Sequence, residues 1–293
     1  MSDRWRGLFQ RRGFLSWVSL VLVTCLVVVS CSKAPEVSNA PSASPSGSAM
    51  STEITVATED DYPPFDFLDN GQHVGYNQSL LDLVAKTKAL KVKQEILPFQ
   101  GILAGIASNK YTASNSAIGI TAKRAEVVDF TMPITELTNF YLTRKGDTSI
   151  KGIKDFAGKT IAVQQGGITS AVLTSHVKPE LEKMGLKVGN VKEYGAFAEA
   201  YQDLLNKRVD VVFNNIVALK RLVGEKPNLY EIGGQVGPKV YASWAVKKGN
   251  KAMLDVLNDG LAKAKASGEM KALQEKWLKV AFDLPDTPTI PPA

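Results

Sequence analysis

The stretch Thr160-Ile-Ala-Val-Gln-Gln-Gly-Gly-Ile-Thr-Ser170 places an apolar strand, then two glycines, then the start of a helix near Thr169. Glycines let the chain turn sharply between strand and helix, which is the order of a unit in an α/β fold. Backbone N–H groups at a helix start, with the helix dipole behind them, suit a carboxylate or phosphate. A plain strand-to-helix turn favours the same glycines, so the stretch predicts the fold class and leaves an anion site open.

Strand-like and helix-like segments alternate on both sides of this stretch, which predicts α/β architecture with parallel sheets. Extended segments at 140–144 and 239–244 are expected to cross between two lobes, forming a hinge and a cleft suited to a ligand. The expected strands are 54–58, 91–97, 160–164, 209–213 and 239–246, and the expected helices are 79–90 with Ser79 as N-cap, 102–108, 196–206 and one or two within 250–279.

The composition is that of a globular protein. The chain has 293 residues, of which 44% are hydrophobic and 22% charged, and this argues against disorder, collagen and a polytopic membrane protein. A net charge of +6 would by itself suggest nucleic acid or an acidic membrane as a partner. However, four arginines against one aspartate lie within residues 1–30, so a nucleic-acid partner loses its main support.

Residues 1–30 are typical of an export signal, with a basic start and an almost wholly apolar run at 14–29. Val28-Val-Ser-Cys31 is similar to the lipoprotein signal pattern, which implies cleavage before Cys31 and lipidation of its thiol. An uncleaved membrane-anchor helix is the alternative. Arg11-Arg-Gly-Phe-Leu15 also resembles a twin-arginine signal, so this route and the general secretion route both stay open.

Residues 31–52 are rich in Ser, Pro and Ala and are expected to form a flexible tether, because they cannot bury enough surface to order themselves. The folded part is therefore expected outside the cytoplasmic membrane, anchored through Cys31. Cys25 lies in the discarded run, so a Cys/His zinc site and a Cys–His nucleophile pair are excluded. Residues 152–160 resemble a phosphate-binding loop, but five residues separate the glycines where four are required.

Arg124 follows an apolar segment at 116–120, where an arginine fork near a strand end suits a carboxylate. Its neighbours Lys123 and Glu126 are equally compatible with a solvated helix face. The residue alone does not decide between these two interpretations.

Four segments stand out in the following order: Tyr62-Pro-Pro-Phe-Asp-Phe67 with Gly71 and Val74-Gly-Tyr76, then 120–133 (Ile-Thr-Ala-Lys-Arg to Val-Val-Asp-Phe-Thr-Met-Pro), then 204–212, then 257–278 ending Lys-Trp-Leu. In this order they resemble the polar amino-acid family of extracellular solute-binding proteins, the capture subunits of ATP-driven importers. The resemblance covers residues 53 to 279. It implies a two-lobed periplasmic-binding-protein fold of type II, an α/β fold in which each lobe is a sheet flanked by helices, with two hinge crossings. The expected parts are 1–30 as lipoprotein signal peptide, 31–52 as tether, 53–142 plus 240–283 as lobe 1, 143–239 as lobe 2 and 284–293 as a Pro-rich tail.

The resemblance also implies roles for individual residues. Arg124 would clamp the ligand carboxylate, assisted by N–H groups near Gly119 and 166–168, while Tyr62 and Phe99 would flank the ligand side chain. Glu59 stands where the family often has an aspartate near the ligand. The expected ligand-binding residues are Glu59, Tyr62, Phe99, Ala117, Gly119, Thr121, Arg124, Gln165, Gly166, Gly167, Ile168 and Asn215.

Departures from the family pattern bear on the ligand. Asn215 stands where the family usually has an aspartate that binds the ligand ammonium, and Gly119 replaces the usual Ser or Thr. Asn215 can still accept through its amide oxygen but offers no charge for a buried ammonium. Either Glu59 supplies that charge or the ligand is not an ordinary α-amino acid, and we favour the first.

We therefore expect a lipid-anchored, monomeric receptor that captures an amino acid or an amino-acid-like small carboxylate and presents it to membrane permease subunits. No metal and no cofactor are expected. One alternative is an enzyme on the same scaffold, similar to the cyclohexadienyl or arogenate dehydratases, with Glu59 as general acid. Another is a ligand-binding sensor lipoprotein, which would have to signal through a partner.

Overall fold

The computed structural model describes residues 53–291. The predicted leader, Cys31 and the tether lie outside the described residues, as do the last two residues of the predicted tail. Within the described range, none of the helices has both the length and the apolar character needed to cross a membrane.

The first lobe is built around a five-stranded sheet with the strand order β5-β1-β6-β16-β8. β1 runs parallel to β5 and β6, whereas β16 runs antiparallel to β6 and β8. Its strands are β1 (Glu53–Thr58), β5 (Lys91–Ile96), β6 (Ala113–Ser114), β8 (Val128–Phe130) and β16 (Ala245–Lys247).

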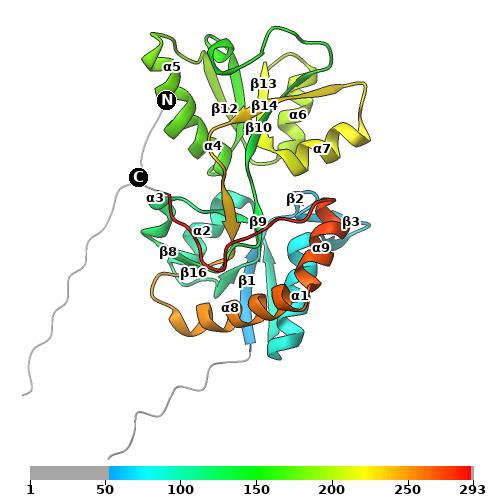
Figure 1. Cartoon of the computed structure of the whole chain (residues 1–293), viewed down its shortest axis with the longest axis vertical. Helices are drawn as coiled ribbons and strands as arrows, with labels where there is room; N and C mark the ends of the chain where they lie inside the picture. Colours follow the sequence, from blue (N-terminus) through cyan, green and yellow to red (C-terminus); the bar gives the residue numbers. More distant parts are fainter. Residues whose placement is uncertain (1–52, 292–293) are drawn as a thin grey trace, which may run out of the picture. The chain divides into compact units, whose positions relative to one another are not determined.

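Helices cover both faces of this sheet (Figure 1). Alternate residues of β1 point to opposite faces. Ile54 and Val56 join the cluster that contains Leu80 and Leu257, while Ala57 joins the cluster under Ile102. The helices are α1 (Tyr76–Lys88), α8 (Lys251–Ala266) and α9 (Glu269–Leu278) on one face, and α2 (Phe99–Ala107) on the other, with the short α3 (Ala122–Ala125) beside β8.

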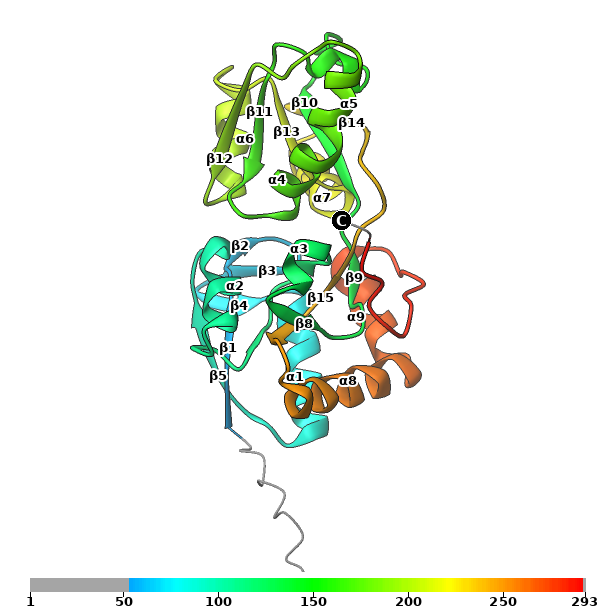
Figure 2. The ribbon, with the colours of Figure 1, turned by 90° about the vertical axis from the view of Figure 1, so that its left-hand side faces the viewer.

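The second lobe repeats this plan with the strand order β12-β11-β13-β10-β14 (Figure 2). β11 is parallel to β12 and β13, and β10 is antiparallel to β13 and β14. The strands are β10 (Asn139–Arg144), β11 (Thr160–Gln164), β12 (Asn190–Tyr194), β13 (Val211–Asn215) and β14 (Tyr230–Val236). α6 (Phe197–Leu205) and α7 (Ile216–Glu225) cover one face, and η1 (Ile153–Phe156), α4 (Ile168–Val172), the π-helical η2 (Leu173–Val177) and α5 (Lys178–Lys183) cover the other.

Two small sheets complete the described part. One joins β7 (Ile118–Gly119), β15 (Tyr241–Ser243) and β9 (Thr135–Glu136), and the other joins β2 (Asp61–Tyr62), β3 (Asp66–Asp69) and β4 (Gln72–Val74). The chain passes from the first lobe to the second between β9 and β10, and returns between β14 and β15. β10 already pairs with the second sheet at Asn139, ahead of the predicted lobe boundary at 142. The exact lobe boundaries stay predictions.

Most predicted elements are confirmed, including the strand at 160–164 and the helix that starts next to Thr169. The prediction for the segment 239–246 was wrong, because it forms two strands, β15 and β16, that belong to different sheets. The predicted crossing at 140–144 was also wrong, because that segment is the hydrogen-bonded strand β10.

Ser79 was wrongly predicted as the N-cap of the first helix. α1 begins three residues earlier, after Gly75 at φ 129°, where a Cβ would lie 2.2 Å from the carbonyl oxygen of Phe65. Tyr76 anchors this start, since its hydroxyl donates to the carbonyl oxygen of Ile134 at 2.5 Å. The hydroxyl of Ser79 instead accepts from the indole N–H of Trp277 at 2.9 Å.

Candidate functional site

Polar side chains gather where parallel strands of both lobes end. Glu59 follows β1 of the first lobe, and Gln164 closes β11 of the second lobe. Gln164 Nε2 donates to Glu59 Oε2 at 2.9 Å, so the two strand ends are joined across the lobes. We call the region between these strand ends the interlobe cleft.

Glu59 is fully buried and only partly satisfied. Its Oε1 has no hydrogen-bond partner among residues 53–291, while its backbone N–H donates to Ser116 Oγ at 3.1 Å. Burial raises the pKa of Glu59 well above its ordinary value, and the nearby charges of Asp61 and Asp66 raise it further. Glu59 is thus a buried acid that accepts from Gln164 and whose carboxyl group interacts with the neighbouring carboxyl group of Asp61.

Arg124 supplies a buried cation in the same cleft. Its Nη1 donates to the carbonyl oxygen of Gly119 at 2.7 Å, and its Nη2 donates across the lobes to the carbonyl oxygen of Gly166 at 2.8 Å. The guanidinium lies 5.7 Å from the ring centre of Phe99. Burial lowers the pKa of Arg124 to about 10, and no carboxylate within the described part of the chain forms an ion pair with it.

Tyr62 forms a second bridge between the lobes. Its hydroxyl donates to Asn214 Oδ1 at 3.1 Å and accepts from Asn215 Nδ2. Its ring stacks between the rings of Phe65 in the first lobe and Phe197 in the second lobe. The ring centres lie 5.1 Å and 5.3 Å from that of Tyr62. The aromatic partner of Tyr62 across the cleft is therefore Phe197, whereas Phe99 faces Arg124.

The side-chain oxygen of Asn215 is used within the second lobe, where it caps a helix. It is the N-cap of α7, and its Oδ1 accepts from the N–H groups of Val217 at 2.9 Å and Ala218 at 3.0 Å. Because the amide oxygen already has two donors, only the amide nitrogen faces Tyr62. Asn215 is thus a hydrogen-bond donor in the cleft, and a ligand ammonium would have to find its acceptor elsewhere.

Gly119 lets the two lobes approach closely beside Arg124. A Cβ at this position would lie 2.9 Å from Cγ1 of Ile168, the first residue of α4. Any larger residue at 119 would therefore push against the second lobe.

The structure brings most of the predicted site residues together but not all of them. Gln165 is exposed, and its backbone N–H donates to Tyr194, so its side chain does not join the cleft contacts. Thr121 caps α3 by accepting from the N–H of Arg124 at 3.2 Å, and Ala117 is buried in the main apolar cluster. The residues that contact one another across or within the cleft are Glu59, Tyr62, Phe99, Gly119, Arg124, Gly166, Ile168 and Asn215.

Sequence reasoning missed Gln164, Phe197 and Asn214. Gln164 and Asn214 are polar residues at the ends of strands that are otherwise apolar and buried. A buried polar residue at the carboxyl end of a parallel strand is a recognisable sign of a ligand site in α/β proteins. Phe197 carries no such sign, since an aromatic residue at a helix start is equally typical of a core.

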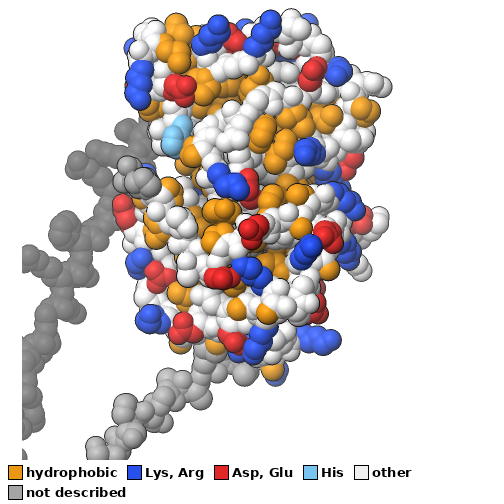
Figure 3. Space-filling model, viewed as in Figure 1, with side chains coloured by type: hydrophobic (Ala, Val, Ile, Leu, Met, Phe, Trp, Pro, Cys, Tyr) orange, Lys and Arg blue, Asp and Glu red, His pale blue; other side chains and the backbone are white. Residues whose placement is uncertain are grey.

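A cavity of about 350 Å³ opens between the lobes next to Tyr62. Hydrophobic side chains gather along this boundary on the face shown in Figure 3. The cavity is lined mainly by aromatic and charged side chains, among them Asp60, Asp61, Phe67, Phe197, Tyr201, Arg221 and Tyr230. Within residues 53–291, no cluster of three or more His, Cys, Asp and Glu side chains is arranged to hold a metal ion.

Comparison with known proteins agrees with this geometry. The L-cystine-binding protein TcyJ of Escherichia coli K12 is 27% identical over 226 residues, covering 76% of this chain and 82% of that protein. A putative ABC transporter arginine-binding protein of the same organism is 28% identical over 232 residues, covering 77% of this chain and 90% of that protein. A solved structure of an ancestral arginine-binding protein bound to arginine superposes with a TM-score of 0.70 and 33% identity, covering 78% of this chain and 99% of that one. The family model of the bacterial extracellular solute-binding proteins, family 3, matches residues 54–280, and the chain belongs to that family.

Proposed function

We propose that this protein captures a zwitterionic amino acid, or a closely related small carboxylate, in the interlobe cleft. It would present this ligand to the membrane subunits of an ABC importer. The similar proteins are named for binding cystine and arginine, which supports an amino acid as the ligand.

One observation carries the proposal. The cleft holds a buried guanidinium and a buried carboxyl group, and neither has an ion-pair partner of opposite charge among residues 53–291. Burying a charge without a partner is costly, whereas a ligand with both charges would satisfy Arg124 and Glu59 together. In this arrangement Arg124 binds the ligand carboxylate, and Glu59 Oε1 accepts from the ammonium.

The remaining residues of the cleft fit the same role. Gln164 orients Glu59 through a 2.9 Å hydrogen bond, and Asn215 provides a donor beside Tyr62. Tyr62 and Phe197, which stack on each other, also line the neighbouring cavity, whereas Glu59 and Arg124 do not line it.

Replacing Arg124 by Ala tests the carboxylate site. A ligand present at about 100 times its Kd stabilises a protein by about 2.7 kcal/mol. The test screens the standard L-amino acids and L-cystine by thermal shift on the wild type, and then measures the best probe on Arg124→Ala. We expect the ligand-induced shift to disappear in this variant and to persist in Lys123→Ala, an exposed neighbour. A wild-type shift in Arg124→Ala would overturn the site assignment.

The location is part of the proposal. Cleavage before Cys31 and lipidation of its thiol would tether the folded part, as a monomer, to the outer face of a membrane. The sequence pattern at Val28–Cys31 supports this. Cys31→Ser should move the protein from the membrane fraction to the soluble fraction if the signal is still cleaved, and an unchanged distribution would contradict lipid anchoring.

A further inference from the structure

The cavity next to Tyr62 is lined by residues of both lobes. It measures about 350 Å³ and lies where β2 and β3 of the first lobe face α7 of the second lobe (Figure 1). Neither Glu59 nor Arg124 lines it, so the cavity is separate from the two charges proposed to hold the amino acid. A molecule bound in this cavity would contact both lobes at once.

Aromatic rings form much of the wall of the cavity. Phe197 stacks on Tyr62, with ring centres 5.3 Å apart, and on Tyr201, with ring centres 6.0 Å apart. Tyr230 continues the series, since its ring centre lies 6.2 Å from that of Tyr201. All four rings line the cavity. The face of an aromatic ring attracts a positive charge, so this wall suits an organic cation.

Two carboxyl groups of the first lobe, Asp60 and Asp61, line the same cavity without a positive partner. Neither of them forms an ion pair with a lysine or arginine among residues 53–291. Burial, followed by the charge of Asp60, raises the pKa of Asp61 to about 6, so Asp61 is mainly ionised at pH 7.5. A carboxylate that is partly removed from water is unfavourable without a counter-charge, and a cation beside it would lower its free energy.

The two basic side chains that line the cavity do not neutralise these carboxylates. Arg221 pairs with Glu225, with 2.8 Å between Nε and Oε1, and its guanidinium lies 4.7 Å from the ring centre of Phe67. Lys226 is exposed and forms no ion pair within the described part of the chain. The contact between Arg221 and Phe67 shows that an aromatic ring of this cavity accepts a cation, whereas the two carboxylates remain without one.

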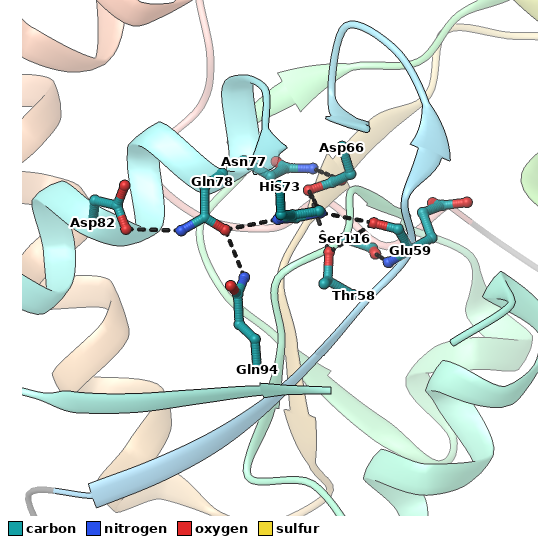
Figure 4. Close-up of polar contacts among 9 residues, drawn as sticks. All are labelled: Thr58, Glu59, Asp66, His73, Asn77, Gln78, Asp82, Gln94 and Ser116. Atoms are coloured by element: carbon teal, nitrogen blue, oxygen red, sulfur yellow. Dashed lines mark hydrogen bonds and ion pairs between the residues drawn. The ribbon is translucent and has the colours of Figure 1, made fainter. Parts of the chain in front are cut away.

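The backbone around the two carboxylates is held in place. The N–H of Glu59, the residue before them, donates to Ser116 Oγ at 3.1 Å, and its carbonyl oxygen lies 2.9 Å from His73 Nε2 (Figure 4). In Figure 4 the carboxyl group of Glu59 points away from this network. The carbonyl oxygen of Asp60 accepts from the N–H of Leu68 at 3.2 Å, and the next residue begins β2, which pairs with β3. A cation would therefore meet carboxylates on an ordered backbone, which lowers the entropic cost of binding.

We propose that this cavity is a second binding site, which takes a small organic cation with an ammonium or guanidinium group, with Asp60 and Asp61 as its counter-charges and the rings of Phe197 and Tyr201 as its wall. Because the cation contacts both lobes, it stabilises their closed arrangement and raises the affinity for the amino acid. By linkage, the amino acid raises the affinity for the cation by the same factor. The coupling rests on the proposed function, whereas the binding of the cation does not.

The first experiment titrates agmatine, a guanidinium amine without a carboxyl group, into the protein at pH 7.5 by calorimetry. Agmatine should bind the wild type, and Asp60→Asn and Asp61→Asn should each weaken this binding about tenfold, as expected for a lost charged hydrogen bond. Asp69→Asn, which removes an exposed acid of β3 that does not line the cavity, should bind as the wild type does. Absence of binding to the wild type, or wild-type affinity in both cavity variants, would overturn the proposal whether or not the protein binds amino acids.

The second experiment distinguishes a separate cation site from a subsite for the side chain of the captured amino acid. The best-binding amino acid with an uncharged side chain is titrated with and without saturating agmatine. Its affinity should rise about fivefold with agmatine in the wild type and stay unchanged in Asp60→Asn. An unchanged affinity in the wild type would contradict the coupling, and a lower affinity would show that the two molecules compete for one site, which would overturn the proposal. Binding of agmatine without binding of any amino acid would contradict the proposed function alone.

Discussion

At the scale of single residues, the interlobe cleft contains two ionisable side chains, Glu59 and Arg124, that are both buried. Glu59 is buried beside other acids, and Arg124 is buried against two carbonyl oxygens. Burial disfavours the charged form of each group, which is why the pKa of Glu59 rises and that of Arg124 falls. A bound zwitterion would lower the pKa of Glu59 and raise that of Arg124. The change at Glu59 can be measured as a proton released to the solvent.

Ligand binding should release a proton at neutral pH. Burial raises the pKa of Glu59 and so favours its protonated form in the free protein, whereas an ammonium group at Oε1 would favour the ionised form. Calorimetry in buffers of different ionisation enthalpy should show a release of up to one proton per ligand. Glu59→Gln should abolish the release and weaken binding by about tenfold to a hundredfold, as expected for a lost charged hydrogen bond. Equal enthalpies in all buffers would contradict this role of Glu59.

Asp61 should make the folded state less stable as the pH rises. Burial, followed by the charge of Asp60, raises the pKa of Asp61 from 3.8 to about 6. Between about pH 4 and pH 6 the folded state holds a proton that the unfolded state has lost, so the free energy of unfolding falls as the pH rises. At pH 7.5, Asp61→Asn should therefore raise the free energy of unfolding by about 1 kcal/mol relative to the wild type, a value already reduced because Asp61 is partly exposed. At pH 3.5 the variant and the wild type should unfold with the same free energy. Asp69→Asn, an exposed neighbour, should change neither value in urea unfolding.

At the scale of elements, the first residues of two helices in the second lobe, α7 and α4, contact the first lobe at the cleft. α7 begins at a cap whose oxygen is used twice by backbone N–H groups and whose nitrogen reaches Tyr62 of the other lobe. α4 begins at Ile168, which packs against Gly119. Each of these starts therefore serves the fold of one lobe and the contact with the other.

Asn215 allows these two roles to be separated. Asn215→Ala removes both capping bonds and the donor to Tyr62, so the free energy of unfolding should fall by about 1–3 kcal/mol. Asn215→Asp retains a capping oxygen and should stay within about 1 kcal/mol of the wild type. Asn250→Ala removes a cap of α8 that accepts from Met253, far from the cleft, and should cost only about 1 kcal/mol. Equal losses in Asn215→Ala and Asn250→Ala would show that the bond to Tyr62 contributes nothing.

The sequence predicted elements well where local pattern decides them. The strand at 160–164 and the helix around 197–205 follow from apolar runs and their periodicity. The division of 239–246 into two strands was not predictable in this way. It depends on Trp244, whose backbone N–H donates to Thr131 Oγ1 at 3.1 Å, a contact between distant parts of the sequence.

The same distinction holds for the candidate site. Glu59, Tyr62 and Arg124 could be named in advance because they belong to a recognisable pattern. Gln164 was missed although it is a polar residue at the end of an apolar strand, whereas Phe197 could not be named, because its role arises only where the second lobe meets the first. For the same reason the use of the Asn215 oxygen as a helix cap became visible only from the hydrogen bonds of α7.

At the scale of the whole described part, the contacts between the lobes are made largely by the residues proposed to hold the ligand. Arg124 reaches Gly166, Gln164 reaches Glu59, and Tyr62 reaches Asn214 and Asn215. Arg221 of α7 adds a contact outside the cleft, 4.7 Å from the ring centre of Phe67. Closure and ligand capture thus depend on one set of side chains.

Gly119→Ala should hinder closure without disturbing either lobe. The added methyl group would lie 2.9 Å from Ile168, and relieving this overlap requires the second lobe to move away. Amino-acid affinity measured by calorimetry should fall about tenfold, corresponding to ~1.4 kcal/mol of strain, while the circular dichroism spectrum stays that of the wild type. Gly224→Ala in α7, where a Cβ meets nothing within 4 Å, should bind as the wild type does. Wild-type affinity in Gly119→Ala would show that this contact does not limit closure.

The packing of Ile168 against Gly119 also constrains which substitutions these two positions can accept together. A serine or threonine at 119 would place a hydroxyl near Arg124, but its Cβ would overlap with Ile168. A smaller residue at 168 would have to be acquired first, and until position 119 is filled it would leave a gap between the lobes. The two positions are therefore an epistatic pair, and only one order of substitutions avoids a blocked intermediate.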